Sequence, residues 1–362
     1  MKPYTQTTLS AFFTACALTF SLPAAADDTT QFNQAGQAYQ KQDYATAFNL
    51  WMPLAQKGYK EAQNNIGLMY ERGQSVKQDY AQAMQWYQKA SQQGLVDAQY
   101  NIGVLYKRGW GVKQDYAQAM QWYLKAAQQG DAEAQNNIGV LYDQGSGVKQ
   151  DYAQAMQWYL KAAQQGHAKA QYNIGVLYDQ GWGVKQDDAQ AAQWYQKAAQ
   201  QGDAYAQYNI GNMYRDGRGV KQDYAQAMQW FLKAAQQGDA SAQNNIGGLY
   251  DQGQGVKQDY AQAMQWYLKA AQQGHASAQN NIGVMYKRGQ GVKQDYAQAM
   301  QWYQKAAQQG DALAQYGIGV LYYNGRGVAR DLQQARYWFE LAAKQGHQKA
   351  IEGLKKLDQI QR

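Results

Sequence analysis

DAEAQNNIGVLYDQGSGVKQDYAQAMQWYLKAAQQG, at Asp131–Gly166, is the stretch that decides the fold. Similar copies precede and follow it without insertion, and each closes on a glycine at the same spacing: Gly58, Gly94, Gly130, Gly166, Gly202, Gly238, Gly274, Gly310 and Gly346. A fixed period of roughly 20–50 residues is typical of proteins built from stacked repeats, in which each unit packs against its neighbours. The chain is therefore expected to repeat one 36-residue structural unit.

The first half of each copy predicts a helix that ends in a glycine turn. Ala134, Ile138 and Leu141 fall at i, i+4 and i+7, which places them on one face of a helix. Gly145 and Gly147 follow this helix, and glycine adopts the positive φ found at helix ends more readily than other residues do.

The second half of each copy predicts another helix. Asp151 with Gln154 three residues later has the pattern of a capping box, which begins a helix. The apolar side chains after it again have helical spacing: Tyr152, Ala155, Met156, Tyr159 and Ala163. Gly166 ends this helix. Because one hairpin cannot bury both apolar faces alone, neighbouring copies must complete the core.

One glycine of each copy lies inside the first helix, where glycine costs about 1 kcal/mol relative to alanine. It recurs as Gly67, Gly103, Gly139, Gly175, Gly211, Gly247, Gly283 and Gly319. A missing side chain lets a bulky neighbour approach the backbone. We therefore expect close helix packing at Gly139, with the ring of Trp158 or Tyr159 against it.

The pattern resembles the Sel-one-like repeat family, a relative of the tetratricopeptide repeats with a longer turn. The matching residues are Ala134-Gln135, Ile138-Gly139, Leu141-Tyr142, Gly145, Gly147-Val148, Asp151-Tyr152, Ala155, Trp158-Tyr159, Ala162-Ala163 and Gly166. The resemblance covers most of the chain and implies an all-α fold, a right-handed α/α superhelical solenoid of 36-residue helix-turn-helix repeats. Such solenoids are used mainly as scaffolds for protein partners.

Residues 1–26 have the features of a secretory signal peptide. Lys2 supplies a positive start, Leu9–Leu22 is apolar, and small residues precede an expected cleavage after Ala26. We therefore expect a periplasmic or secreted protein with no transmembrane segment once the signal is removed. Cys16 is the only cysteine and lies in this leader, so the mature chain would have no thiol or disulfide chemistry.

Atypical copies are expected at both ends, because a solenoid must shield its exposed core faces. Residues 27–59 combine a short leader with a tetratricopeptide-like capping hairpin, whose helices are expected at Gln31–Lys41 and Tyr44–Lys57. Eight repeats of the Sel-one-like type occupy residues 60–346. Residues 347–362 are expected to form a C-terminal capping helix.

The charge pattern does not indicate a nucleic-acid interface. Without Lys2, 33 basic side chains face 27 acidic ones. Lysines recur in the turns as Lys77, Lys113, Lys149, Lys185, Lys221, Lys257 and Lys293. An aspartate follows each of these lysines two residues later. The lysine and aspartate charges therefore largely neutralise each other, which is typical of a solvated turn.

Differences between the copies concentrate at four variable positions of the first helix, spaced by three, four and three residues. In one repeat the first to fourth variable positions are Tyr205, Tyr208, Asn212 and Arg215. The spacing places them on the side of the helix opposite the apolar face, and this side lines the concave surface in the resembling family. Neutral drift on a solvent-facing side would also confine variation there. Tyrosines collect at these positions, however, and interfaces are enriched in tyrosine and arginine.

The tip of the turn, Ser146 in the quoted copy, is a fifth variable place. Trp110 and Trp182 occupy it where other copies have polar residues. Each tryptophan could anchor a partner or fold back over its own hairpin. For Trp182, Asp188 replaces the tyrosine that begins the next helix in other copies, and Ala192 replaces a methionine, which leaves room that the tryptophan could fill.

No arrangement in the sequence indicates catalysis, a metal site or a cofactor. His167, His275 and His347 lie two or three repeats apart, on the order of tens of Å for helices ~8–10 Å apart, which is too far for one zinc ion. Capping of the following helix is the simpler role for these histidines. Ser146 to Lys149 fits S-x-x-K, but the accompanying S-D-N and K-T-G motifs are absent.

The sequence thus predicts a monomeric, non-enzymatic scaffold that binds a protein partner on its concave face. The resemblance to secreted members of the Sel-one-like repeat family implies a role in envelope regulation, host-factor binding or effector neutralisation. Two alternatives stay open: a β-lactam or cell-wall hydrolase of the family's cysteine-rich type, and a structural spacer. The residues assigned to partner binding are Tyr100, Lys107, Trp110, Tyr172, Trp182, Tyr205, Tyr208, Asn212, Arg215 and Tyr316.

Overall fold

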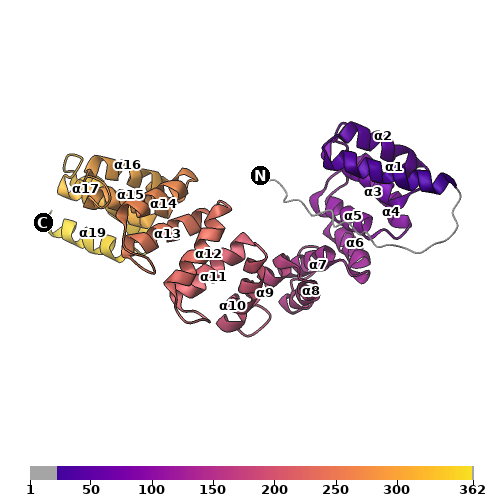
Figure 1. Ribbon diagram of the computed structural model, residues 1–362. Coiled ribbons are helices and arrows are strands. Elements are labelled where there is room, and N and C mark those ends of the chain that lie inside the picture. The colour runs from indigo at the N-terminus through magenta and orange to yellow at the C-terminus, as the bar shows by residue number, and fades with distance from the viewer. Residues whose placement is uncertain (1–22, 361–362) are drawn as a thin grey trace. The chain divides into compact units, whose positions relative to one another are not determined.

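The computed structural model describes residues 23–360, in which all regular elements are α-helices (Figure 1). They are α1 (Pro23–Gln40), α2 (Tyr44–Gln56), α3 (Lys60–Arg72), α4 (Tyr80–Gln92), α5 (Val96–Arg108), α6 (Tyr116–Gln128), α7 (Ala132–Gln144), α8 (Tyr152–Gln164), α9 (Ala168–Gln180), α10 (Asp188–Gln200), α11 (Ala204–Asp216), α12 (Tyr224–Gln236), α13 (Ala240–Gln252), α14 (Tyr260–Gln272), α15 (Ala276–Arg288), α16 (Tyr296–Gln308), α17 (Ala312–Asn324), α18 (Leu332–Lys344) and α19 (Gln348–Ile360). The chain divides after Ala134 into an N-terminal unit and a C-terminal unit.

Within each unit, helices that follow one another in the chain pack side by side. In the C-terminal unit α9 packs on α10 within one repeat, and α10 packs on α11 of the next repeat. In the N-terminal unit α3, α4, α5 and α6 follow the same rule. The predicted α/α solenoid of two-helix repeats is therefore confirmed.

The core of each repeat is made by small and branched side chains around one aromatic ring. In the fourth repeat Ile174 and Leu177 of α9 and Tyr195 of α10 are at most 1% exposed. Fully buried alanines such as Ala170 and Ala198 let the helices approach closely. The apolar face predicted from the helical spacing is thus the one that the molecule buries.

The glycine inside the first helix makes room for the buried ring of the second helix, as expected. A Cβ atom on Gly139 would lie 2.6 Å from Cδ1 of Tyr159, and one on Gly175 would lie equally close to Tyr195. The neighbour is therefore the tyrosine and not the tryptophan. The close approach explains why the first helix keeps a residue of low helix propensity.

The turn chemistry also agrees with the sequence. Gly145 and Gly147 have φ values of 67° and 72°, in the left-handed region that favours glycine. The carboxylate of Asp151 accepts a hydrogen bond of 2.9 Å from the backbone N–H of Gln154. This contact satisfies one of the free N–H groups at the start of α8.

Buried glutamines connect successive repeats through their amide groups. Gln207 of α11 is buried, donates to the carbonyl of Ala199 at 3.1 Å, and accepts from the side chain of Gln237 at 2.8 Å. The same Gln237 amide also donates to the carbonyl of Gly202. Because each buried amide has partners, these polar groups cost little and fix the register between repeats.

The N-terminal helix is longer than the sequence predicts. It was expected at Gln31–Lys41, whereas α1 extends from Pro23 to Gln40 and includes residues 23–26 of the predicted signal peptide. The extension is held by Asp28, whose carboxylate accepts from Lys57 Nζ at 2.5 Å and from the Tyr59 hydroxyl at 2.8 Å. The rest of that signal peptide, residues 1–22, lies outside the described residues. From residue 23 to residue 360, no helix combines the length and the apolar character needed to cross a membrane.

Candidate partner-binding face

The ten residues assigned to partner binding fall into two groups. Three of them, Tyr100, Lys107 and Trp110, belong to the N-terminal unit, and the other seven belong to the C-terminal unit. Within each unit, we call the four variable positions of successive first helices the first-helix face.

The tyrosines at the second variable position are less exposed than the sequence implies. Tyr100, Tyr172, Tyr208 and Tyr316 are all half-buried. Each lies against the core ring of its own second helix, with ring centroids 5.7 Å apart for Tyr172 and Tyr195 and 6.1 Å apart for Tyr208 and Phe231. The expectation of a side fully opposite the core is therefore wrong for this position. A tyrosine is long enough to reach over the gap left by the helix glycine and touch the ring beneath.

Tyr205, at the first variable position of α11, is exposed, unlike the tyrosines of the second variable position. Its side chain is 64% exposed, and its ring centroid lies 6.0 Å from that of Tyr172 in the preceding repeat. The two rings thus form one aromatic surface. Tyr172 packs against the core ring of Tyr195, and Tyr205 is exposed to solvent. Burial and the nearby carboxylate of Asp203 raise the pKa of Tyr172, so its hydroxyl stays neutral.

Asn212 and Arg215 already have partners within the unit. The side-chain carbonyl of Asn212 accepts from Nδ2 of Asn245 at 3.0 Å, so it links α11 to α13. The guanidinium of Arg215 donates to both carboxylate oxygens of Asp216, at 2.7 and 2.9 Å. Both side chains are half-buried, and both belong to the first-helix face next to Tyr208.

The fourth variable position has a structural role that the sequence analysis missed. Asp143 and Asp179 accept hydrogen bonds from the hydroxyls of the core tyrosines Tyr159 and Tyr195. Burial raises the pKa of Asp143. The sequence carries only a partial signal for this pairing: the core tyrosine becomes Phe231 where the fourth variable position is Arg215, but Tyr303 is kept where that position is Lys287.

The turn tips contact the preceding repeat. The ring of Trp110 stacks on Tyr80 at 4.9 Å between centroids, and the ring of Trp182 stacks on Tyr152 at 5.3 Å. The guanidinium of Arg108, from the same repeat, also lies over the ring of Trp110, 4.3 Å from its centroid, whereas the stacking partner of Trp182 comes from the preceding repeat. Trp182 remains 42% exposed above Tyr152.

An arginine of the next turn occupies the place where Asp188 replaces tyrosine. Arg218 Nη2 pairs with the carboxylate of Asp188 at 2.9 Å and with that of Asp179. Since these groups belong to adjacent repeats, the ion pairs of Arg218 take the place of the ring stacking that joins the Trp110 and Trp182 tips to their preceding repeats.

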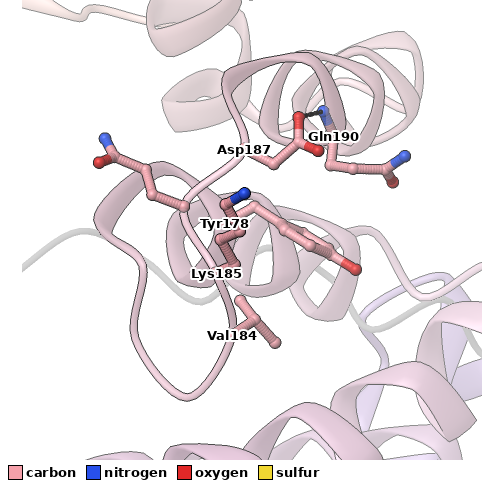
Figure 2. A pocket seen from close by; sticks show the side chains of 6 residues that line it. Tyr178, Val184, Lys185, Asp187 and Gln190 are labelled. Atoms are coloured by element: carbon pink, nitrogen blue, oxygen red, sulfur yellow. Dashed lines mark hydrogen bonds between the residues drawn. The ribbon is translucent and has the colours of Figure 1, made fainter.

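The turn after α9 borders an open depression of about 580 Å³ (Figure 2). Figure 2 shows the capping bond from the N–H of Gln190 to Asp187 at its edge. The lining residues are Tyr178, Val184, Lys185, Gln186, Asp187 and Gln190. In other repeats the glutamine of this turn donates to the tyrosine hydroxyl of the next helix, as Gln222 does to Tyr224 at 3.0 Å. Two residues after Gln186 the chain has Asp188 instead of tyrosine, so this hydroxyl acceptor is missing beside the depression.

A family model of the Sel1 repeat matches eight consecutive segments: residues 60–95, 96–131, 132–167, 168–203, 204–239, 240–275, 276–311 and 312–347. These segments cover well over half of the chain. The chain belongs to the Sel1 repeat family. The eight matched Sel1 repeats begin at α3, so α1 and α2 precede them.

Solved structures of Sel1 repeat proteins are similar over most of the chain. c5321, described as a protective antigen present in uropathogenic Escherichia coli strains with an SLR fold, is 35% identical, with a TM-score of 0.74 over 92% of this chain and 80% of its own. A Sel1 repeat protein from Oxalobacter formigenes is 37% identical, with a TM-score of 0.63 over 67% of this chain and 99% of its own. The comparison with curated proteins gave no match.

The histidines of the Sel1 repeats cap helices, as the sequence predicts. Nδ1 of His167 accepts from the backbone N–H of Ala170 at 3.1 Å, and His275 and His347 make the same contact at 3.2 Å. Aspartates such as Asp203 do so in other repeats. Among residues 23–360, no three His, Cys, Asp or Glu side chains gather as metal ligands would.

Ser146 of the S-x-x-K sequence has the ordinary turn geometry of a Sel1 repeat. Its backbone N–H donates to the carbonyl of Leu141 at 3.0 Å. The tips at Trp182 and Arg218 make the equivalent bond at the same length. The match to a catalytic motif therefore arises from the common turn.

Proposed function

We propose that this Sel1 repeat protein is a non-enzymatic scaffold whose protein partner binds the first-helix face of the C-terminal unit, around Tyr205. Sel1 repeat proteins generally mediate protein–protein interactions, and the proposal adds a location for the contact. The exposed ring of Tyr205 is the observation that carries it.

The fold does not require an aromatic side chain at this position. Equivalent positions in other repeats hold Asp97, Lys169 and Ser277, and their helices have the same length. Leu313, at the same position of α17, is 56% exposed. Large apolar groups left in solvent cost solubility, and tyrosine is enriched among the residues that dominate interface energies.

The variant Tyr205→Ala should lose partner binding while it keeps its fold. We expect affinity to fall about tenfold or more, which corresponds to the ~1.4–2 kcal/mol of an interface anchor. Recovery of partners from an envelope extract by tagged wild type and variant, compared by quantitative mass spectrometry, measures this loss.

Tyr337→Ala is the matched control for that experiment. Tyr337 is 52% exposed but lies on α18, a second helix. The control should recover the same partners as the wild type. Equal recovery of every partner by the Tyr205→Ala variant would count against this face.

We also propose that the protein acts in the periplasm or outside the cell, after cleavage behind Ala26. The proposal is supported by the charge, apolar stretch and small residues of 1–26. The mass of the intact protein from a periplasmic extract should correspond to a chain that begins at Asp27. A cytoplasmic protein that keeps residues 1–26 would contradict this location.

A further inference from the structure

The contact between a turn tip and the preceding repeat recurs along the chain, so the charges at equivalent positions can be compared between pairs of repeats. Between the fourth and fifth repeats, the tip residue Arg218 pairs with Asp179 at the fourth variable position of α9. It also pairs with Asp188 at the start of α10. A positive tip therefore meets two negative partners in the repeat before it.

Three repeats later the same positions carry a different set of charges. Arg326 is the tip residue, and its guanidinium lies 5.5 Å from the ring centroid of Tyr296, which stands where Asp188 stands in the earlier pair. Lys287 occupies the position equivalent to Asp179. Two cations thus lie where the earlier repeats have an ion pair.

Further positive groups surround this place. Arg288 follows Lys287 at the end of α15, and Lys349 lies in the first turn of α19. Lys287 is half-buried, and burial together with Arg288, Arg326 and Lys349 lowers its pKa. We call these four residues the cationic cluster.

The cationic cluster has no carboxylate in an ion pair with any of its members within residues 23–360. The carboxyl of Asp251 is close enough to Arg288 for this charge to oppose the rise that burial causes in its pKa. One carboxylate does not balance four cations. Of the four side chains, Lys287 is half-buried and the other three are exposed. Repulsion from like charges around the half-buried Lys287 destabilises the folded chain, and binding of an anionic group would relieve this cost.

We propose that the cationic cluster binds a carboxylate-rich segment of the protein partner; this inference rests on the proposed function and assigns chemistry to its partner. Guanidinium groups such as those of Arg288 and Arg326 can bind carboxylates in a bidentate manner, and lysine adds a point charge. The cluster is confined to α15, the turn after α17 and α19. A nucleic acid would need a longer row of free cations, and aspartates neutralise the lysines of the other turns.

Binding of a fluorescein-labelled decaglutamate peptide to the purified protein tests the inference. In low-salt buffer, fluorescence anisotropy should show saturable binding that weakens with added salt. The Lys287→Asp variant should bind about tenfold more weakly or worse, because it loses one charged contact and gains a repulsive one. Its midpoint of urea unfolding should rise, since the new carboxylate would pair with Arg326 as Asp179 pairs with Arg218.

Lys257→Asp is the matched control, with the same change of net charge in an exposed turn of the same unit. It should change peptide affinity less than twofold. Arg326→Gln provides a second variant of the cluster that keeps a polar side chain, and it should also weaken binding.

Three results would overturn the inference: no peptide binding by the wild type, equal weakening by Lys257→Asp and Lys287→Asp, or equally tight and equally Lys287-dependent binding of a single-stranded decanucleotide. The last result would mean that the cluster binds any polyanion and has no preference for carboxylates. None of these results bears on whether Tyr205 is needed for partner recovery, so failure of the acidic segment and failure of the scaffold function can be told apart.

Discussion

Replacing Gly219 with alanine should destabilise the C-terminal unit by about 3 kcal/mol or more. Gly219 lies in the turn after α11, with φ of 66°. A Cβ atom there would overlap the carbonyl of Asp188 and lie 2.7 Å from the backbone nitrogen of Ala189, both in the preceding repeat. Backbone atoms at the start of a helix cannot rotate away, so overpacking adds to the cost of the left-handed conformation.

The variant Gly238→Ala separates the cost of the left-handed backbone conformation from the cost of overpacking. Gly238 also has a positive φ, of 90°, but an added Cβ would meet no atom within 4 Å. This control should cost only the backbone strain, about 1–2 kcal/mol. Urea unfolding followed by circular dichroism would compare the two variants. If both were equally stable, the turn would not be docked on the preceding repeat.

Gly247→Ala should destabilise the protein by about 1–2 kcal/mol, whereas the same change at the adjacent Gly248 should stabilise it by up to about 1 kcal/mol. Alanine has the higher helix propensity at both positions. At Gly247, however, the new Cβ would lie 2.6 Å from Cδ1 of Tyr267, which is 3% exposed and cannot move freely. The resulting overpacking outweighs the gain in propensity.

At Gly248 the only neighbour of an added Cβ is the Tyr267 hydroxyl, at 3.8 Å, which is an ordinary contact. The midpoints of urea unfolding of the two single variants should therefore move in opposite directions from that of the wild type. A Gly247→Ala variant as stable as Gly248→Ala would show that the helices do not need the glycine.

The sequence predicts the repeat and its core well, because both follow from local periodicity. The spacing of Ala134, Ile138 and Leu141 predicts the first helix of each repeat and its buried face, and the spacing of Ala155 and Tyr159 does the same for the second helix. Gly139 in a helix predicts a close contact, and the candidates for its neighbour include the correct ring, Tyr159.

The site is predicted less well, because its contacts join different repeats. Periodicity places Tyr172 on the variable side of α9, but it does not say that the ring reaches back to Tyr195. Trp182 stacks on Tyr152, thirty residues earlier, and a single repeat read alone cannot reveal this partner. The ion pair of Arg218 with Asp179 could have been found by comparing positions 39 residues apart along the chain.

The same comparison identifies the cationic cluster. Equivalent positions that hold Asp179 and Arg218 in one pair of repeats hold Lys287 and Arg326 in another. Neutral drift and partner binding predict similar variation in sequence. They differ in what they predict for stability. Partner binding explains why cations whose repulsion lowers stability are present, whereas neutral drift does not.

Amide hydrogen exchange of the protein with and without its captured partner tests the central claim most directly. If the partner binds the first-helix face, exchange should slow in α9, α11 and α13 while the second helices α10, α12 and α14 change little. Protection confined to the second helices, or to the turn tips, would contradict the account.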